Sequence, residues 1–265
     1  MGDGSAANCA VANRGLPMVT ICVLTYGDYL ELALQVIESI RTNCCRSQYR
    51  LVVGANAVGC ETLDYLQSLE QEGHIDRLVA SPVNINKCPM MRRMFEGIET
   101  DFIWWFDDDS YVTEPGALDQ WLEHALTAPE ATVMWGELAF CGNKLGFTDI
   151  DDVIGFVRRA PWYRGLPPPS WHPGGKGELN FENKGCGDGR WIFIVGGCWL
   201  IRSHTIRALD WPDPRLIKLG DDVFLGEAIR QNDWRMGNIG TPGVAVNTVS
   251  RRGNPGSTLL ASTAL

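Results

Sequence analysis

The sequence has no hydrophobic run long enough to cross a membrane and no excess of basic residues. A membrane-spanning helix needs roughly 20 consecutive apolar residues, and no stretch of the 265 residues approaches that length. The formal net charge is −9 and the isoelectric point is near 5.0, whereas proteins that bind nucleic acid broadly carry a basic patch. The composition therefore argues against a membrane span and against broad nucleic-acid binding.

Two further absences concern the cysteines and the N-terminus. Nine cysteines are scattered without a C-x-x-C spacing, which leaves a zinc knuckle unsupported. We expect them to be reduced rather than paired in a disulfide framework. Residues 1–16 lack the basic segment and the apolar run of a secretory signal. These features predict a cytoplasmic protein with loose tails at 1–16 and 251–265.

The sequence does contain a regular alternation of strand and helix patterns up to residue 106. Helical spacing of apolar residues predicts helices at 27–43, 60–73 and 89–99. Apolar, largely β-branched runs predict strands that alternate with these helices, at 18–26, 49–55, 75–81 and 101–106. This order is typical of an α/β protein with a parallel sheet, whose ligands bind at the carboxyl ends of the strands.

The second half of the chain is less regular. Residue patterns there predict, in order, a helix at 118–128, a strand at 132–140, a strand interrupted by a bulge at Gly196-Gly197 within 190–203, and a helix at 220–233. Residues 155–191 are rich in glycine, proline and tryptophan, and a loop of that length inside a compact domain is usually functional or mobile. No composition shift marks a boundary, so we expect one domain over residues 17–250.

Three consecutive carboxylates follow the fourth predicted strand. In "FIWWFDDDSYV" an apolar run leads directly into Asp107, Asp108 and Asp109. In an extended segment Asp107 and Asp109 point to the same side and Asp108 to the other. Adjacent carboxylates repel one another unless a cation compensates, and Mg²⁺ typically takes one or two carboxylates plus substrate phosphates. An acidic turn in which one Asp caps the next segment is the alternative.

These residues, with two later segments, resemble a known enzyme group. "WWFDDDSYV" is similar to a segment of fringe-type and β1,3-glycosyltransferases, as are "VGGCWLIRS" at 195–203 and "GDDVFLGEAIRQNDWRMGNI" at 220–239. "ICVLTYGDY" at 21–29 resembles the opening strand of family-2 glycosyltransferases. The resemblance implies the GT-A fold, in which a Rossmann-like nucleotide-binding half, here 17–116, precedes an acceptor and catalytic half, here 117–250.

The resemblance also implies roles for the carboxylates. Asp107 and Asp109 would hold Mn²⁺ or Mg²⁺ on the diphosphate of a nucleotide-sugar, with a UDP-sugar as the expected donor, and Asp108 would contact the donor sugar or ribose. Asp222 would be the general base that takes the proton from an acceptor hydroxyl, with Asp221 as the reserve candidate. Such a displacement inverts the anomeric carbon, although the fold also permits retention. Asp222 could instead cap the helix that follows it.

The remaining candidates surround the donor and the acceptor. We expect the nucleotide and its phosphates to contact a set of residues near the strand ends: Thr25, Tyr26, Asp28, Asn56, Lys87, Arg92, Arg93, Gly196 and Gly197. Aromatic rings stack well on sugars, so the acceptor candidates are Trp162, Trp171, His172, Trp191 and Trp199. The acceptor itself stays open between a glycan, a peptide, a small molecule and a nucleobase.

The chain departs from the family pattern at two positions. Family-2 enzymes usually have an Asp at the end of the second strand to read uracil, where this chain has Asn56. Many relatives supply a His metal ligand after the catalytic segment, whereas the last histidine here is His204, so Asn247 or water would substitute. Two alternatives to a glycosyltransferase therefore stay open. One is a sugar nucleotidyltransferase, disfavoured by the lack of a Gly-rich phosphate loop, and the other is a non-catalytic carbohydrate-binding protein derived from a transferase.

Overall fold

A computed structural model describes residues 18–141, 155–166, 191–217, 221–246 and 248. The elements in chain order are β1 (Val19–Tyr26), α1 (Leu30–Asn43), the 3₁₀ helix η1 (Arg46–Gln48), β2 (Tyr49–Asn56), α2 (Cys60–Gln71), β3 (Arg77–Ser81), α3 (Lys87–Phe95), β4 (Phe102–Asp107), β5 (Tyr111–Val112), α4 (Ala117–Thr127), β6 (Thr132–Cys141), β7 (Trp191–Arg202), α6 (Ser203–Leu209), α7 (Asp221–Gln231), β8 (Arg235–Asn238) and β9 (Val244–Ala245). The expected tails at 1–16 and 251–265 lie outside the described residues.

The central sheet has seven strands in the order β3-β2-β1-β4-β7-β6-β8. The four strands of the first half are all parallel, with Val19 in register with both Tyr49 and Phe102. β7 is antiparallel to both β4 and β6, and β8 returns parallel to β6. The predicted mostly parallel α/β sheet is confirmed, and strands from both halves of the chain share it.

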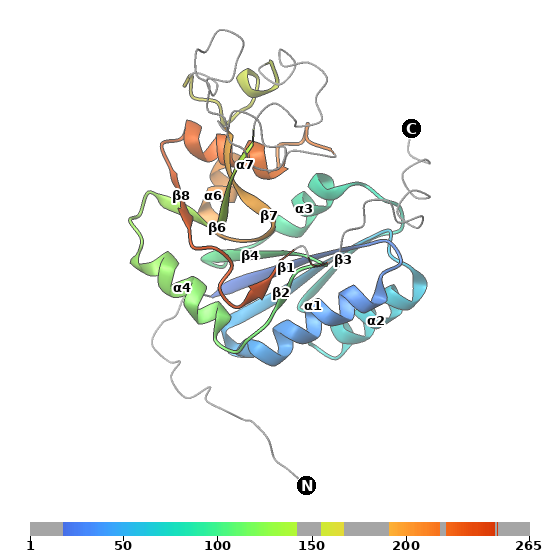
Figure 1. Ribbon diagram of the computed structural model, residues 1–265. Helices are drawn as coiled ribbons and strands as arrows, with labels where there is room; N and C mark the ends of the chain where they lie inside the picture. The colour runs from blue at the N-terminus through green and yellow to red at the C-terminus, as the bar shows by residue number, and fades with distance from the viewer. Residues whose placement is uncertain (1–17, 142–154, 167–190, 218–220, 247, 249–265) are drawn as a thin grey trace.

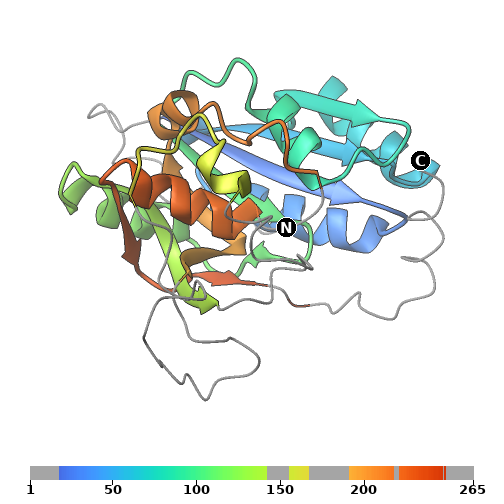
Figure 2. The same cartoon turned by 90° about the horizontal axis from the view of Figure 1, so that it is seen from above.

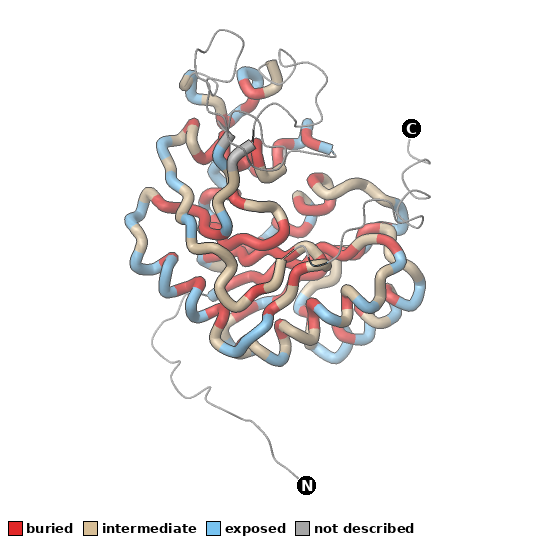
Figure 3. Tube along the Cα trace, viewed as in Figure 1, coloured by how far each residue is buried: buried red, intermediate tan, exposed pale blue. Residues whose placement is uncertain are grey.

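Two hydrophobic cores lie on opposite faces of this sheet (Figures 1 and 3). In β1, Ile21 and Val23 face the core formed with α1, α2 and α4, whereas Cys22 and Leu24 face the core formed with α3, α6 and α7. Successive strand residues point to opposite faces, so an uninterrupted apolar run is what a strand covered on both sides requires. The helices therefore form a layer on each side of the sheet.

The structure differs from the sequence prediction mainly at helix ends and at one cysteine. α3 begins two residues before its predicted start and ends at Phe95 rather than residue 99, because the chain turns at Gly97 with φ of 71°. The described cysteines with free thiols are Cys22, Cys44, Cys60, Cys88 and Cys198. Cys45 is disulfide-bonded, so the prediction of reduced thiols is wrong there. In the part of the chain that the structure describes, no helix has the length and apolar composition of a bilayer span.

Gly226 sets how closely α7 approaches the sheet. A Cβ at this position would lie 2.4 Å from the carbonyl oxygen of Ile192 and 3.0 Å from the Cα of Phe193. Alanine normally stabilises a helix interior relative to glycine by roughly 1 kcal/mol. Here the added methyl would push α7 off β7, so we expect Gly226→Ala to destabilise the protein by about 1–3 kcal/mol.

The measurement is the free energy of unfolding from urea titrations. Gly155→Ala is the matched control, because a Cβ there would meet only the end of the flexible Arg159 side chain, at 3.3 Å. We expect the control to stay within about 0.5 kcal/mol of the wild type. Equal stability of the two variants would show that Gly226 does not limit the approach of α7.

Candidate active site

The polar ends of the first-half strands meet at one edge of the sheet. Tyr26 at the end of β1 is in register with Asn56 on β2, and Asn56 is in register with Ser81 on β3. On the other side of β1, Leu24 is in register with Asp107 at the end of β4. The predicted convergence of these strand ends follows from parallel pairing.

Lys87, the first residue of α3, joins two carboxylates that are distant in sequence. Its Nζ donates to Asp107 Oδ2 at 3.0 Å and lies 3.2 Å from Asp221 Oδ2 at the start of α7. The second oxygen of Asp107 accepts a hydrogen bond from Trp105 Nε1 at 3.1 Å. Strand β4, helix α3 and helix α7 are thus held together at one point by the Lys87 ammonium.

Four carboxylates, Asp107, Asp109, Asp221 and Asp222, form what we call the carboxylate cluster. Burial and the charge of Asp107 raise the pKa of Asp109 to about 6. Burial and the charge of Asp221 raise the pKa of Asp222 to about 6. Burial also raises the pKa of Asp107, against the opposing charge of Lys87.

For Lys87, unlike for the carboxylates, the neighbouring charges affect the pKa more than burial does. Burial alone lowers the pKa of Lys87, but the charges of Asp107 and Asp221 outweigh it and raise the pKa well above the usual range. Among the described residues, only Lys87 forms an ion pair with a member of the cluster. Negative charge is therefore in excess, and a further cation would compensate it.

Asp109 has an oxygen that suits such a cation. Its Oδ1 is buried and has no hydrogen-bond partner among the described residues, while its backbone oxygen accepts bonds from Thr248 N at 2.9 Å and Thr248 Oγ1 at 2.8 Å. The described residues contain no group of three His, Cys, Asp or Glu side chains able to hold a metal. A divalent ion that takes two carboxylates and completes its shell with substrate phosphates fits this arrangement.

Gly196 on β7 lies beside the cluster and leaves space next to it. A Cβ on Gly196 would be 3.4 Å from Asp222 Oδ2 and 3.5 Å from Lys87 Nζ. The other oxygen of Asp222 accepts a hydrogen bond from the Val223 N–H at 2.8 Å. Asp222 therefore bonds its own helix with one oxygen and directs the other toward Gly196. The predicted irregularity is confirmed, because the β6–β7 register shifts between Gly136 and Leu138, opposite residues 195–198.

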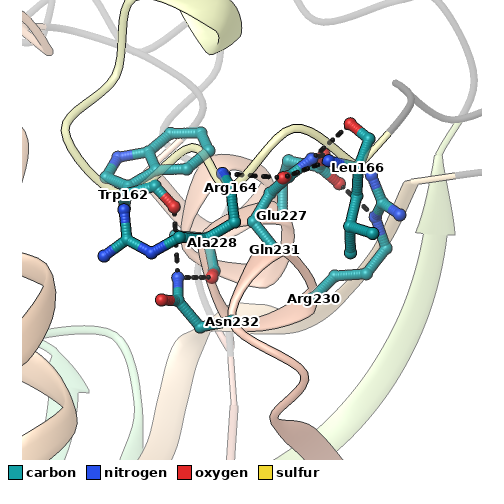
Figure 4. Close-up of polar contacts among 8 residues, drawn as sticks. All are labelled: Trp162, Arg164, Leu166, Glu227, Ala228, Arg230, Gln231 and Asn232. Atoms are coloured by element: carbon teal, nitrogen blue, oxygen red, sulfur yellow. Dashed lines mark hydrogen bonds and ion pairs between the residues drawn. The ribbon is translucent and has the colours of Figure 1, made fainter.

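The far end of α7 is fixed by a polar network (Figure 4). Gln231 Oε1 accepts hydrogen bonds from the backbone N–H groups of Arg164 and Leu166, both at 3.1 Å. Its Nε2 donates to Leu166 O and to Glu227 Oε1, both at 2.9 Å. The buried Glu227 also pairs with Arg230 at 2.6 Å. These bonds attach residues 155–166 to α7, and the view from above shows the two segments side by side (Figure 2). They limit the freedom of the helix that carries Asp221 and Asp222.

Several side chains that were predicted to contact the donor form hydrogen bonds within the protein instead. Asp108 is 4% exposed, and its Oδ2 accepts a hydrogen bond from Tyr26 N at 3.2 Å, which contradicts the predicted contact with the donor sugar. Thr25 Oγ1 donates to Gly54 O at 2.9 Å. The buried Asn56 bonds Asn84 and the Ile85 N–H, so its side chain holds the turn before α3 rather than facing a nucleotide. Burial of all three side chains corrects the prediction of direct contacts.

The remaining strand-end candidates differ in exposure. Asp28 is exposed and Tyr26 is half-buried, with its ring centroid 6.2 Å from that of Tyr29. Gly197 is buried in β7. Arg92 and Arg93 lie on α3 beyond Lys87. Arg92 donates to Pro212 O at 2.7 Å and pairs with Asp210 at 2.6 Å, whereas Arg93 is exposed.

The acceptor prediction is wrong for two of its aromatic residues. Trp162 and Trp199 are 1% and 2% exposed, and Trp199 stacks on Trp105 with ring centroids 5.6 Å apart. Both tryptophans are core residues and cannot form a sugar platform. Trp191 is the first residue of β7, and nothing is established of its side chain. Trp171 and His172, like the substitute metal ligand Asn247, lie outside the described residues.

Sequence reasoning missed the groups that orient the cluster. Thr248 contacts the Asp109 backbone from 139 positions away, and no local pattern marks it. Trp105 sits two residues before the carboxylate that it bonds, but in the sequence it reads as one more apolar strand residue.

Comparisons with known proteins identify the fold. No protein-family model and no curated protein sequence matches the chain. Among solved structures, it is similar to the mannosyltransferase PcManGT from Pyrobaculum calidifontis in complex with GDP-Man and Mn²⁺, with a TM-score of 0.59, 15% identity, and coverage of 89% of this chain and 58% of that one. It is also similar to residues 1–349 of S. aureus TarS in complex with UDP-GlcNAc, with a TM-score of 0.56, 13% identity, and coverage of 91% and 61%.

These likenesses confirm the predicted GT-A-like glycosyltransferase fold. The chain spans about three fifths of the length of each of these two neighbours. The chain is also similar to a larger structure of S. aureus TarS, with a TM-score of 0.56 and 14% identity. It covers 37% of the length of that structure.

The raised pKa of Asp109 predicts that this residue destabilises the protein when no cation is bound. A carboxyl whose pKa is about 6 binds its proton more tightly in the folded than in the unfolded chain. Its ionisation therefore costs stability above pH 6 and costs nothing below its unfolded pKa. We expect Asp109→Asn to stabilise the metal-free protein by about 1–2 kcal/mol near pH 7.5 and to have little effect near pH 4.

Urea unfolding in a chelator-containing buffer measures this difference at the two pH values. Asp64→Asn on α2 is the matched control, because Asp64 is exposed and far in sequence from the cluster. We expect it to change stability by less than about 0.5 kcal/mol. A loss of stability in Asp109→Asn near pH 7.5 would contradict the electrostatic description of the cluster.

Proposed function

We propose that the protein is a metal-dependent glycosyltransferase that moves a sugar from a nucleotide-sugar to an acceptor hydroxyl. One observation carries the proposal. In a GT-A-like fold, Lys87 joins the carboxylate at the end of β4 to the first carboxylate of α7, at 3.0 Å and 3.2 Å. A site with surplus negative charge, a fixed cation and a glycine gap suits a diphosphate that arrives with a divalent ion.

Asp107 and Asp109 are the residues that would hold the ion, Mn²⁺ or Mg²⁺. The partnerless buried Oδ1 of Asp109 and the electrostatic excess of the cluster support this assignment. When bound, the ion supplies Lewis-acid stabilisation of the charge that develops on the leaving diphosphate. Lys87 contributes a positive charge beside the same group and keeps Asp107 in place.

Asp222 is the proposed general base. Its Oδ2 lies near Gly196, where no side chain blocks a substrate, and it forms no ion pair among the described residues, unlike Asp221. A carboxylate with a pKa of about 6 is a stronger base than an ordinary Asp and remains ionised at neutral pH. A single displacement assisted by such a base inverts the anomeric carbon.

The exposed Asp28 and the half-buried Tyr26 are the described strand-end side chains best placed to meet the nucleotide. Tyr26 can stack on a nucleobase because its ring is aromatic and only half-buried. The identity of the nucleobase is a further proposal, and we favour uracil. One structural neighbour is a complex with GDP-Man and another is a complex with UDP-GlcNAc. Both nucleotides therefore belong in the first screen.

A thermal-shift screen of UDP-sugars and GDP-sugars with and without Mn²⁺ tests the proposal. A ligand that binds only the folded state stabilises it by mass action, by about 2.7 kcal/mol at a hundred times its Kd, and so raises the unfolding temperature. We expect at least one nucleotide-sugar to stabilise the protein more with Mn²⁺ than without it. If no nucleotide-sugar stabilises the chain under either condition, the proposed function fails.

Asp109→Ala tests the metal assignment. Removing the carboxylate whose free oxygen would face the ion should weaken Mn²⁺-dependent binding of the donor at least tenfold, as measured by calorimetry. Asp64→Ala on the exposed face of α2 should bind as the wild type does. Unchanged Mn²⁺ dependence in Asp109→Ala would place the ion elsewhere.

The substitution Asp222→Asn tests whether Asp222 is the general base. We expect kcat to fall by about 10²–10⁴ with donor affinity kept within about threefold, because the amide cannot accept the proton. In the wild type, protonation of Asp222 should reduce kcat/KM about tenfold per pH unit below about pH 6. A flat profile between about pH 5 and 8 would assign the base to another group.

A further inference from the structure

The ammonium group of Lys87 occupies a place that the proposed divalent ion also needs. Its Nζ donates to Asp107 Oδ2 at 3.0 Å, and Asp107 Oδ1 accepts a hydrogen bond from Trp105 Nε1 at 3.1 Å. Both oxygens of Asp107 are therefore already bonded within the protein. This distinguishes Asp107 from Asp109, whose buried Oδ1 has no hydrogen-bond partner among the described residues.

An ion bound to Asp107 would lie very close to this ammonium. Small divalent cations bind carboxylate oxygens at about 2.1 Å, so an ion that shared Asp107 Oδ2 with Lys87 would lie within about 5 Å of Nζ. Two cations at that separation repel each other, and the repulsion is poorly screened because the two side chains are only 23% and 28% exposed. In its present position, Lys87 therefore opposes binding of the ion.

Lys87 also has room to bond a ligand without leaving the site. Its Nζ lies 3.2 Å from Asp221 Oδ2, and an ammonium has three N–H donors on a flexible stem. Gly196 lies beside Nζ, where an added Cβ would be 3.5 Å away, so no side chain of residue 196 fills this space. A phosphate oxygen there would accept a hydrogen bond from Lys87 while Asp221 holds the ammonium in place.

We propose that Lys87 couples binding of the divalent ion to binding of the diphosphate. In the free protein its ammonium takes the place of the ion on Asp107 and keeps the affinity for free Mn²⁺ low. When the diphosphate binds, Lys87 transfers its hydrogen bond from Asp107 to a phosphate oxygen, and Asp107 joins Asp109 in holding the ion. The inference rests on the proposed function and adds that ion and diphosphate enter the site together. Lys87 is thus a positioning residue for the metal.

Titration of the full chain with Mn²⁺, without nucleotide, tests the competition. The double variant Lys87→Met with Asp221→Asn loses one positive and one negative charge, so it keeps the net charge of the site and frees Asp107 Oδ2. We expect it to bind Mn²⁺ at least ten times more tightly than the wild type, as measured by the loss of the electron paramagnetic resonance signal of free Mn²⁺. Adding Asp109→Ala should remove this gain, which would locate the ion at the carboxylate cluster.

Titration with UDP and GDP in a chelator-containing buffer tests the contact with the diphosphate. Lys87→Met should bind the tighter of the two nucleotides at least five times more weakly than the wild type, because the phosphates lose the ammonium. The same variant should bind free Mn²⁺ more tightly. Opposite changes in the two affinities indicate coupling, whereas damage to the site would weaken both. Coupling between two ligands is reciprocal, so the factor by which Mn²⁺ raises nucleotide affinity should fall about tenfold.

Two further variants serve as controls. Lys87→Arg retains the positive charge and should retain the weak binding of free Mn²⁺. Arg50→Met loses a positive charge near the start of β2, where Arg50 is exposed and 3.9 Å from Asp76, and should change neither affinity by more than about twofold.

Mn²⁺ affinity in the double variant that equals or falls below that of the wild type would overturn the proposal. The charge-neutral substitution also protects the test against loss of folding, because it leaves no additional unpaired charge at the site. The Mn²⁺ titrations need no nucleotide, so they are read separately from the nucleotide-sugar screen, whose failure would concern the reaction and not the competition between Lys87 and the ion.

Discussion

The arrangement of the site depends on one ammonium group. Lys87 Nζ lies within ion-pair distance of Asp107 and Asp221, residues that belong to a strand and to a helix more than a hundred positions apart. Without a shared cation these carboxylates would repel each other, and α7 would have no electrostatic reason to begin beside β4. The same contact brings the start of α7, and with it Asp222, next to Gly196.

The rest of the fold supports this contact from the other side. α7 approaches β7 closely only because residue 226 has no side chain, and Gln231 ties the end of α7 to residues 155–166. Asn56 holds the turn that leads into α3, and Asn86, with φ of 70°, directs the chain into Lys87. Rigid elements thus keep together charges that would otherwise separate, which is how binding sites accept a local cost in stability.

Much of the fold could be read from the sequence, and less of the site. The strands and helices of the first half follow from apolar runs and helical spacing, because each is a local property of a few neighbouring residues. The candidates Lys87, Asp107, Asp109 and Asp222 came instead from their positions next to predicted strands and helices and from the resemblance to glycosyltransferase segments. Sequence reasoning misjudged Trp162 and Trp199, since a tryptophan in a core and a tryptophan on a binding surface look alike in a sequence.

By itself, therefore, the sequence determined the order of strands and helices, the parallel first half, and the acidic residues at the end of β4 and the start of α7. Only the tertiary structure decided which of these residues meet. It turned Asp108 toward Tyr26 and buried Asn56, left one oxygen of Asp109 without a partner, and placed Thr248 against the Asp109 backbone. The physical reason is that hydrogen bonds and ion pairs between distant elements depend on how the sheet and helices pack, which no local pattern of residues encodes.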